Sequence, residues 1–471
     1  MTESEQKQTA GGSGEMVMQL YEVHEKIHPR AVHGWFNWWR IALVVITQAI
    51  YYGLPWVQWE GRQAVLFDLT ARKFYLFELV LWPQDFIWLA VLLIISALGL
   101  FLFTAVAGRL WCGYACPQTV YTELFMWIER WFEGDHIKQK KLRTMPWNAE
   151  KALRVGGKHL TWVLLALWTG FTFVGYFTPI QELWQELLSL SFGPWELFWI
   201  LFYAAFTWGF AGFMREQVCK YMCPYARFQS VMFDPDTLII TYDYRRGEPR
   251  GGRKKNVDYK AQGLGDCVDC GICVQVCPTG IDIRNGLQYM CIGCAACIDA
   301  CDQVMDKMGY PKGLIRYSTQ NAIDGKYPDK DILRHTFRPR TLFYTLVLAA
   351  ISVAFVYTLA QRVPMRVDVL RDRQALSRES PTGGIENVYR LQIINMDDRP
   401  HRYRITATGI DGLKITRGDQ AEIPALSTDD VNVILEAPRM ALSKPSHPIV
   451  FHVQAEGDPK IVREAKSSFL R

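Results

Sequence analysis

Hydrophobic and polar residues fall into long, separate blocks along this chain. Five blocks are apolar over about 20 residues, the length that an α-helix needs to cross a bilayer. Trp and Tyr residues gather near their ends, as is typical of the interface between lipid and water. One such block could be a buried helix of a soluble protein, but five with aromatic ends predict a membrane domain. The blocks lie near residues 38–59, 86–107, 160–178, 195–214 and 341–361.

A different pattern begins near residue 365. Short segments such as VDVL, NVYRLQIIN, RYRITATG and DVNVILEA alternate apolar and polar residues, with turn residues between them. This period of two is typical of strands with one buried face. Several short strands at this spacing predict an antiparallel β-sandwich.

Positive charge predicts how the helices cross the membrane. The connection between the second and third blocks is rich in Lys and Arg, whereas PIQELWQELLSLSFGP, between the third and fourth, has neither. Because short loops rich in Lys and Arg stay in the cytoplasm, five spans place the N-terminus inside and the C-terminus outside. No apolar core of a signal peptide lies in the first 30 residues, so we expect a flexible N-terminal tail.

Eight of the chain's twelve cysteines lie in one short stretch between the fourth and fifth blocks. Residues 267–301 contain the pattern C-x2-C-x2-C-x3-C twice, which is typical of two [4Fe–4S] clusters whose fourth ligands are exchanged between the runs. Zinc is disfavoured, because the stretch contains no His and its spacing is not that of paired CxxC ligands. We expect one cluster at a first cysteine group, Cys267, Cys270, Cys273 and Cys301, and another at a second cysteine group, Cys277, Cys291, Cys294 and Cys297.

The other four cysteines form two copies of a CxxxCP motif, at the ends of the second and fourth blocks. The copies are 107 residues apart, which indicates an internal repeat of two helical hairpins. Proline disfavours helix in the residue before it and suits the first turn of a helix, so each second cysteine is expected in a break between helices. A role as small buried hydrophobic residues or as a disulfide is disfavoured. We expect a shared thiol site, formed by Cys112, Cys116, Cys219 and Cys223, that binds copper or a third iron–sulfur cluster.

Two other features carry less weight. The basic stretch DYRRGEPRGGRKKN, residues 243–256, is interpreted as a linker on anionic lipid rather than a nucleic-acid site, because it is tethered to a span. A copper site in the C-terminal module is disfavoured, because its candidate ligands are scattered: Met396, His401, Met440, His447 and His452.

The two CxxxCP motifs, the double ferredoxin motif, the fifth span and the C-terminal β module together resemble the CcoG/FixG/RdxA family. The resemblance implies an Ig-like sandwich, and an accessory protein that reduces Cu(II) to Cu(I) for maturing cbb-type haem-copper cytochrome oxidase. It implies that the thiol site is catalytic and binds copper. The N-terminal half also resembles NapH/NosR-type membrane ferredoxins, which pass electrons from quinol to a periplasmic reductase.

The sequence thus predicts a multi-domain protein of the bacterial inner membrane. Its parts are a cytoplasmic segment 1–36, a four-span membrane domain 37–230, a cytoplasmic two-cluster ferredoxin domain 231–335, a fifth transmembrane helix 336–364 and a periplasmic Ig-like sandwich 365–471.

We expect an iron–sulfur oxidoreductase that reduces Cu(II), since thiolates favour Cu(I). The alternatives are a quinol-linked electron conduit and a non-catalytic scaffold for oxidase assembly. His33, His159 and His335 all lie near the predicted cytoplasmic ends of spans, which weakens a transmembrane haem relay. Oxidase-assembly and copper-delivery proteins and membrane lipid are expected partners, and nucleic acid is not. The donor is either a soluble protein or quinol, and a homo-oligomer is compatible with this arrangement.

Overall fold

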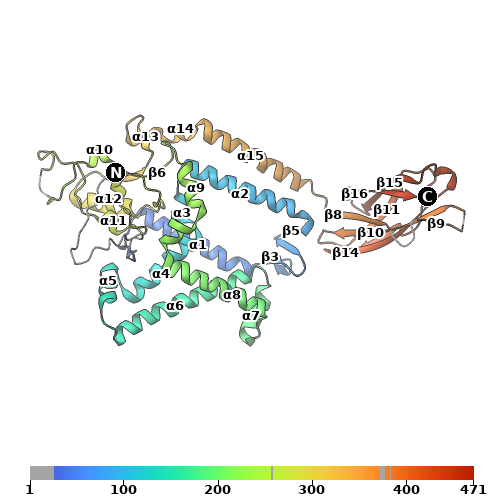
Figure 1. Cartoon of the computed structure of the whole chain (residues 1–471), viewed down its shortest axis with the longest axis horizontal. Coiled ribbons are helices and arrows are strands. Elements are labelled where there is room, and N and C mark those ends of the chain that lie inside the picture. The colour runs from blue at the N-terminus through green and yellow to red at the C-terminus, as the bar shows by residue number, and fades with distance from the viewer. Residues whose placement is uncertain (1–25, 256–257, 372–376, 382) are drawn as a thin grey trace, which may run out of the picture. The chain divides into compact units, whose positions relative to one another are not determined.

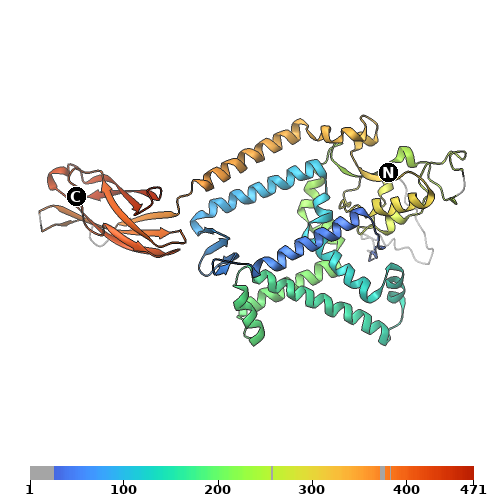
Figure 2. The same cartoon turned by 180° about the vertical axis from the view of Figure 1, so that it is seen from behind.

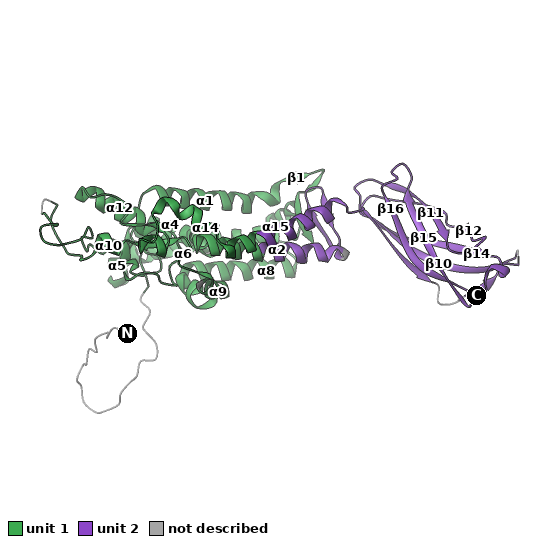
Figure 3. Ribbon diagram, turned by 90° about the horizontal axis from the view of Figure 1, so that it is seen from above, with its two compact units in different colours: residues 1–69, 97–345 green, residues 70–96, 346–471 purple. Residues whose placement is uncertain are grey.

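A computed structural model describes residues 26–255, 258–371, 377–381 and 383–471. The polar tail expected at the N-terminus lies outside the described residues. The chain divides into two compact units, Met1–Leu69 with Ala97–Thr345 and Thr70–Ser96 with Leu346–Arg471 (Figure 3).

Helices form most of the first unit (Figure 1). The α6 and α8 helices pack closely because Gly170 of α6 lies against α8, where a side chain would run into the carbonyl oxygen of Ile200. Small residues commonly allow such close approach between helices in membranes. The helices that come before the ferredoxin part are α1 Trp35–Gly53, α2 Phe86–Ala107, α3 Leu110–Tyr114, α4 Pro117–Glu133, α5 His136–Thr144, α6 Ala149–Val174, α7 Ile180–Ser189, α8 Pro194–Thr207 and α9 Pro224–Met232.

Three helices among the described residues are long and apolar enough to cross a membrane. They are α2, the continuous helical stretch Pro194–Met214, and α15, Pro339–Ala360. All three coincide with expected spans. The helices at the other two expected spans are α1 and α6, whose crossing of the membrane stays a prediction.

The chain after α8 has an unusual backbone. It continues as two π-helical segments, η3 (Trp208–Met214) and η4 (Val218–Met222), separated near Arg215 with φ 42°. Isolated π-helical turns are uncommon and occur frequently at functional sites. No sequence pattern predicted this change of helix type, although η4 contains Cys219 of the second CxxxCP motif.

The ferredoxin part is built on short elements. The strand β6 (Ile239–Tyr242) pairs antiparallel with β7 (Ile315–Ser318). Asp299 of α12 accepts hydrogen bonds from the backbone N–H groups of Phe36 and Asn37 at 3.3 and 2.8 Å, so its carboxylate caps the first turn of α1. Figure 2 shows the N-terminal end of α1, in blue, beside the yellow ferredoxin part. The remaining helices are α10 Tyr244–Gly247, α11 Ile272–Gln275, α12 Ala296–Met308, α13 Gln320–Ile323 and α14 Ile332–Thr336.

The C-terminal part of the second unit is a β-sandwich, as the alternating pattern predicted. One sheet has the order β12-β14-β10-β8, with β9 beside β10, and the other has the order β13-β11-β15-β16. Tyr389 and Leu391 of β10 and Phe451 of β15 are fully buried between the sheets. The strands are β8 Met365–Arg371, β9 Arg378–Glu379, β10 Ile385–Asn395, β11 His401–Thr408, β12 Lys414–Arg417, β13 Gln420–Ile423, β14 Thr428–Ala437, β15 Ser446–Ala455 and β16 Val462–Leu470.

A hairpin from the connection between the first two apolar blocks packs against this sandwich. Lys73 Nζ donates to the carbonyl oxygen of Leu426 at 2.8 Å, and Trp82 packs beside Ile394 and Met396. The hairpin is therefore part of the second unit. The strands of this connection are β1 Gln58–Trp59, β2 Arg62–Gln63, β3 Val65–Asp68, β4 Lys73–Leu76 and β5 Leu79–Leu81.

Candidate functional site

The eight ferredoxin cysteines lie around two small cavities. All four members of the first cysteine group line one cavity. All four members of the second cysteine group line the other, together with Cys273 of the first group. Each group of four thus combines three cysteines of one run with the last cysteine of the other run at the same cavity. Four thiolates are the donor set that a [4Fe–4S] cluster needs, so these residues fit two clusters.

The environment of these thiols is apolar. Burial, with a smaller contribution from neighbouring thiolates of the same group, raises the pKa of Cys273 to about 11 and that of Cys291 and Cys301 to about 12. Without a cation these groups hold their protons at neutral pH. Because thiolates are the ligands of metals, binding of iron must release those protons.

The two CxxxCP motifs adopt similar local structures. Cys116 and Cys223 are the N-cap residues of α4 and α9, both with extended backbone and both followed by a proline in the first helical turn. The break between helices that proline predicted is present in both copies. Cys112 lies in α3 and Cys219 in η4, so each motif joins a short helical segment to a longer helix.

The two CxxxCP motifs lie near each other, since Gln229 in the helix after the second motif lies 3.4 Å from Sγ of Cys112. Burial raises the pKa of Cys112 to about 11 and that of Cys219 to about 12. Thiolates of the other motif add to both shifts, Cys223 acting on Cys112, and Cys112 and Cys116 acting on Cys219. The repeat inferred from the sequence therefore has a spatial counterpart.

The described residues include no group of three His, Cys, Asp or Glu side chains placed to hold a single metal ion.

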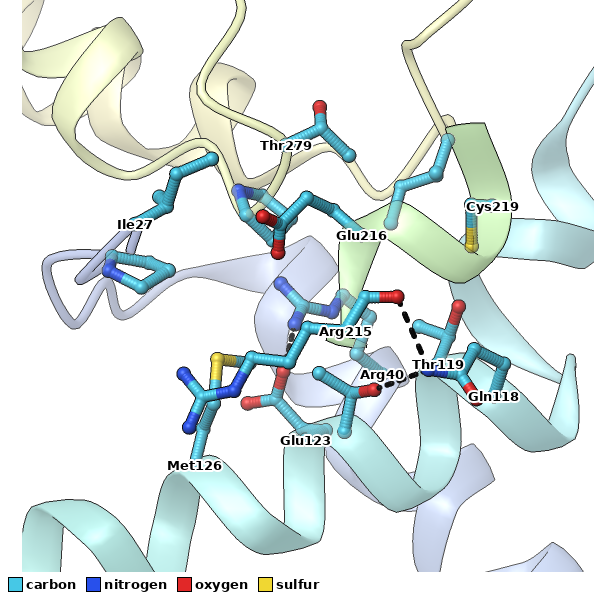
Figure 4. A pocket seen from close by; sticks show the side chains of 14 residues that line it. Ile27, Arg40, Gln118, Thr119, Glu123, Met126, Arg215, Glu216, Cys219 and Thr279 are labelled. Carbon is cyan, nitrogen blue, oxygen red and sulfur yellow. Dashed lines mark hydrogen bonds and ion pairs between the residues drawn. The ribbon is translucent and has the colours of Figure 1, made fainter. Parts of the chain in front are cut away.

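A pocket reaches the thiol site from one side (Figure 4). Cys219 lines it together with Arg215 and Glu123 of the helical part and with Pro278 and Thr279 of the ferredoxin part. Figure 4 shows the Cys219 side chain at one edge of this pocket and Thr279 at another.

Buried ion pairs surround this pocket, and the sequence analysis missed them. Glu129 is 2% exposed and pairs with Arg215 at 2.6 Å and Lys26 at 2.7 Å. Arg40 pairs with Glu123, and both are buried. Arg40 was the available signal, since a charge inside an apolar block is costly and usually marks a site or a partner.

The His and Met residues of the sandwich do not gather into a site. His401 pairs with Asp397 at 2.7 Å, and His452 lies 3.3 Å from Glu464. Met396 is buried in the contact with the hairpin, whereas Met440 is 98% exposed. These positions agree with ordinary core and surface roles.

Family models match three regions of the chain. A model described as a 4Fe-4S dicluster domain matches residues 214–320, and one described as an IG-like fold at the C-terminal of FixG matches residues 355–471. A third, described as a 4Fe-4S binding domain, matches residues 89–134, where the cysteines are Cys112 and Cys116.

Whole-chain relatives are similar over most of their length. The nitrogen fixation protein FixG of Rhizobium meliloti is 39% identical over 435 residues, which cover 85% of this chain and 83% of that protein. Protein RdxA of Cereibacter sphaeroides is 40% identical over 435 residues, which cover 89% and 91%. A crystal structure of a FixG-related protein from Vibrio parahaemolyticus is 20% identical, covers 23% of this chain and 96% of that one, and has a TM-score of 0.21.

Proposed function

Since this chain belongs to the FixG/RdxA family, we propose that it is a membrane-bound iron–sulfur oxidoreductase that reduces Cu(II) to Cu(I) at the thiol site. The observations that support the proposal are the approach of Gly113 in the first CxxxCP motif to Cys294 of the second cysteine group, and the contact of Cys112 with Gln229 in the helix after the second motif. Four soft ligands next to an electron-transfer centre suit the reduction of a metal whose reduced form prefers thiolates.

The residues of the chain account for the steps around copper. The thiols of Cys112 and Cys219 hold their protons when no cation is present, because burial raises their pKa values to about 11 and about 12. Binding of copper displaces these protons, and the resulting thiolates stabilise Cu(I) more than Cu(II). The pocket at Cys219 offers copper a route to the thiols. The two cysteine groups would hold iron–sulfur clusters, which would supply single electrons.

The setting proposed for this reaction is the bacterial inner membrane. Five spans, with the ferredoxin part in the cytoplasm and the sandwich in the periplasm, are supported by the Lys and Arg asymmetry and by three apolar helices. Copper-delivery and oxidase-assembly proteins then receive Cu(I), and maturation of cbb-type cytochrome oxidase is the process served. The sandwich offers a surface for docking such partners.

A quinol-linked electron conduit is the second candidate. It is favoured by the match of a 4Fe-4S binding model around Cys112 and Cys116. In that case the thiol site holds a third cluster, and electrons continue to another acceptor.

Anaerobic purification followed by iron counting and a Cu(II)-reduction assay tests both candidates. About eight iron atoms per chain indicate two clusters, which leaves the thiol site for copper, and a higher count indicates a third cluster. Cys116→Ala or Cys223→Ala should abolish Cu(II) reduction while the EPR spectrum of the two ferredoxin clusters persists. Full reductase activity in the variant with all four thiols replaced by Ala would refute the proposal.

A further inference from the structure

We infer that electrons leave the ferredoxin part through the second cysteine group and reach the thiol site across a direct backbone contact at Gly113 and Gly293. The inference rests on the proposed function and adds the order of the centres. The order holds whether the thiol site contains copper or a third cluster.

The first observation is the position of Gly113, between the two cysteines of the first CxxxCP motif. A methyl group added to Gly113 would lie 2.8 Å from the Cα and backbone nitrogen atoms of Cys294, which belongs to the second cysteine group. Cys112 also packs against the apolar cluster that contains Cys294 and Ile292. The backbone of the motif therefore touches the backbone of the ligand loop with no side chain between them.

Gly293 makes the same contact from the other side. Its φ is +72°, but the equivalent residue of the first run, Asp269, has φ 51° and carries a side chain. The backbone conformation alone thus does not require glycine at this place. A methyl group on Gly293 would lie 3.0 Å from the carbonyl carbon and oxygen of Arg109, just before the first motif. Close packing against that segment explains why the second run has a glycine there.

The second CxxxCP motif faces the same cysteine group. Lys220 Nζ donates to the carbonyl oxygen of Thr279 at 3.2 Å, and Thr279 Oγ1 lies 3.3 Å from Sγ of Cys277. Cys219 lines its pocket together with Thr279 and Ile292. Both halves of the repeat therefore approach the second cysteine group.

Arg109 links the same two places. Its side chain is 5% exposed and donates a hydrogen bond to the carbonyl oxygen of Ala226 in α9, while its own carbonyl group lies against Gly293. Cys273 of the first cysteine group lines the cavity of the second. The second group thus lies next to both the first group and the thiol site.

The electron path follows from this order. One electron passes from the first group to the second and from the second to the thiol site. In the last step the second cluster is oxidised by one electron and Cu(II) is reduced to Cu(I), so no bond forms or breaks. The contact at Gly113 and Gly293 positions the two centres and takes no part in the chemistry.

Matched glycine variants test the path. Gly293→Ala introduces a methyl group into the contact, whereas Gly271→Ala, in the first run, introduces one that meets no other protein atom within 4 Å, at φ +64°. Alanine is acceptable at that backbone position, because Ala295 occupies the equivalent place in the second run with φ 60°. Gly113→Ala is a stronger perturbation of the contact, and Gly293→Ala serves if that variant fails to fold.

The measurement uses full-length protein in detergent under anaerobic conditions. The clusters are reduced, excess reductant is removed, and the loss of cluster reduction after mixing with one equivalent of Cu(II) is followed by stopped-flow absorbance. We expect a several-fold slower transfer in Gly293→Ala, with unchanged iron content and EPR spectrum, and an unchanged rate in Gly271→Ala. Equal rates in the two variants would overturn the inference.

A second readout does not depend on copper reduction. Co(II), a paramagnetic ion that binds thiolates, is added to reduced protein, and relaxation of each cluster's EPR signal is recorded. We expect Co(II) to enhance relaxation of the signal that survives in Cys301→Ser, which retains the second group. Enhanced relaxation confined to the signal of the first cysteine group would overturn the proposed order of the centres. Wild-type protein that shows the expected Co(II) effect but never reduces Cu(II) would refute the proposed function and leave the order standing.

Discussion

Gln229 Nε2 lies 3.4 Å from Sγ of Cys112, and the Gln229 side chain is fully buried. Gln229 belongs to α9, the helix that follows the second CxxxCP motif. The second half of the repeat therefore contacts a cysteine of the first half. The residue 107 positions earlier is Thr122, which lines the pocket with Cys219. Cys112 is therefore held by an amide, whereas Cys219 faces a pocket, and the two halves are not equivalent.

Gln229→Leu should make Cys112 a slower nucleophile. Burial raises the pKa of Cys112, and the hydrogen bond from Gln229 partly opposes this. Since such a bond contributes about 1 kcal/mol and the thiolate is the reactive form, alkylation of Cys112 in metal-free protein should slow several-fold. Mass spectrometry after iodoacetamide treatment measures this. Cys219 is the internal control, and equal slowing of both thiols would indicate a general structural change instead.

Cys277→Ser and Cys301→Ser should damage opposite clusters. Cys277 lines the cavity of Cys291, Cys294 and Cys297, although it follows the first run in the sequence. Serine is a poor ligand for iron, so each variant should lose about four of about eight iron atoms. EPR of the reduced proteins should show that the signal kept by one variant is the signal lost by the other. Loss of the same signal in both would contradict the exchanged ligands.

The sequence predicted the parts of this molecule whose information is local. Cysteine spacing within a few residues specifies the ligand loops, and alternation along single strands specifies the sandwich. The strand β16, VREAKSSFL, was not predicted from the sequence, because few of its residues are apolar. Only its hydrogen-bonded pairing with β15 identifies it as a strand. This pairing connects separate strands and leaves no local pattern.

Contacts between distant segments explain what the sequence did not reveal at the site. The approach of Gly113 to Cys294 and the pairing of Glu129 with Arg215 join residues far apart in the chain. In the sequence, the glycine within CxxxC is also compatible with a flexible position. Glu129 is compatible with an ordinary surface charge on an amphipathic helix. The role of Gly113 follows from the packing of the ferredoxin part on the helices, and that of Glu129 from the packing of α4 against the segment at Arg215.

Phosphatase fusions test the orientation of the chain. A fusion after residue 400 should be active, because five spans place the sandwich in the periplasm, where the enzyme folds. A fusion near residue 260 should be inactive, because the Lys- and Arg-rich segments keep the ferredoxin part in the cytoplasm. Activity at both sites, or the reverse pattern, would contradict five spans.

Glu129→Ala should destabilise the protein far more than Glu150→Ala. Glu129 is buried against Arg215 and Lys26, whereas Glu150 forms an exposed pair with Arg154 at 2.9 Å. Removing one partner of a buried pair leaves uncompensated charge and costs about 3–5 kcal/mol, whereas an exposed pair contributes about 0–1 kcal/mol. Thermal unfolding in detergent, followed by tryptophan fluorescence, should show a lower Tm for Glu129→Ala alone.

Acid should remove the same stabilisation from the wild type. Burial alone would raise the pKa of Glu129, but the charges of Arg215 and Lys26 outweigh it and hold the pKa at about 2, below the ordinary 4.5. A depressed pKa stabilises the fold at pH values above 4.5, by about 3 kcal/mol here, and this is lost as the pH falls from 4.5 towards 2. The difference in Tm between wild type and Glu129→Ala should therefore shrink over this range, and a difference that stays constant would show that the carboxylate charge is not what stabilises the pair.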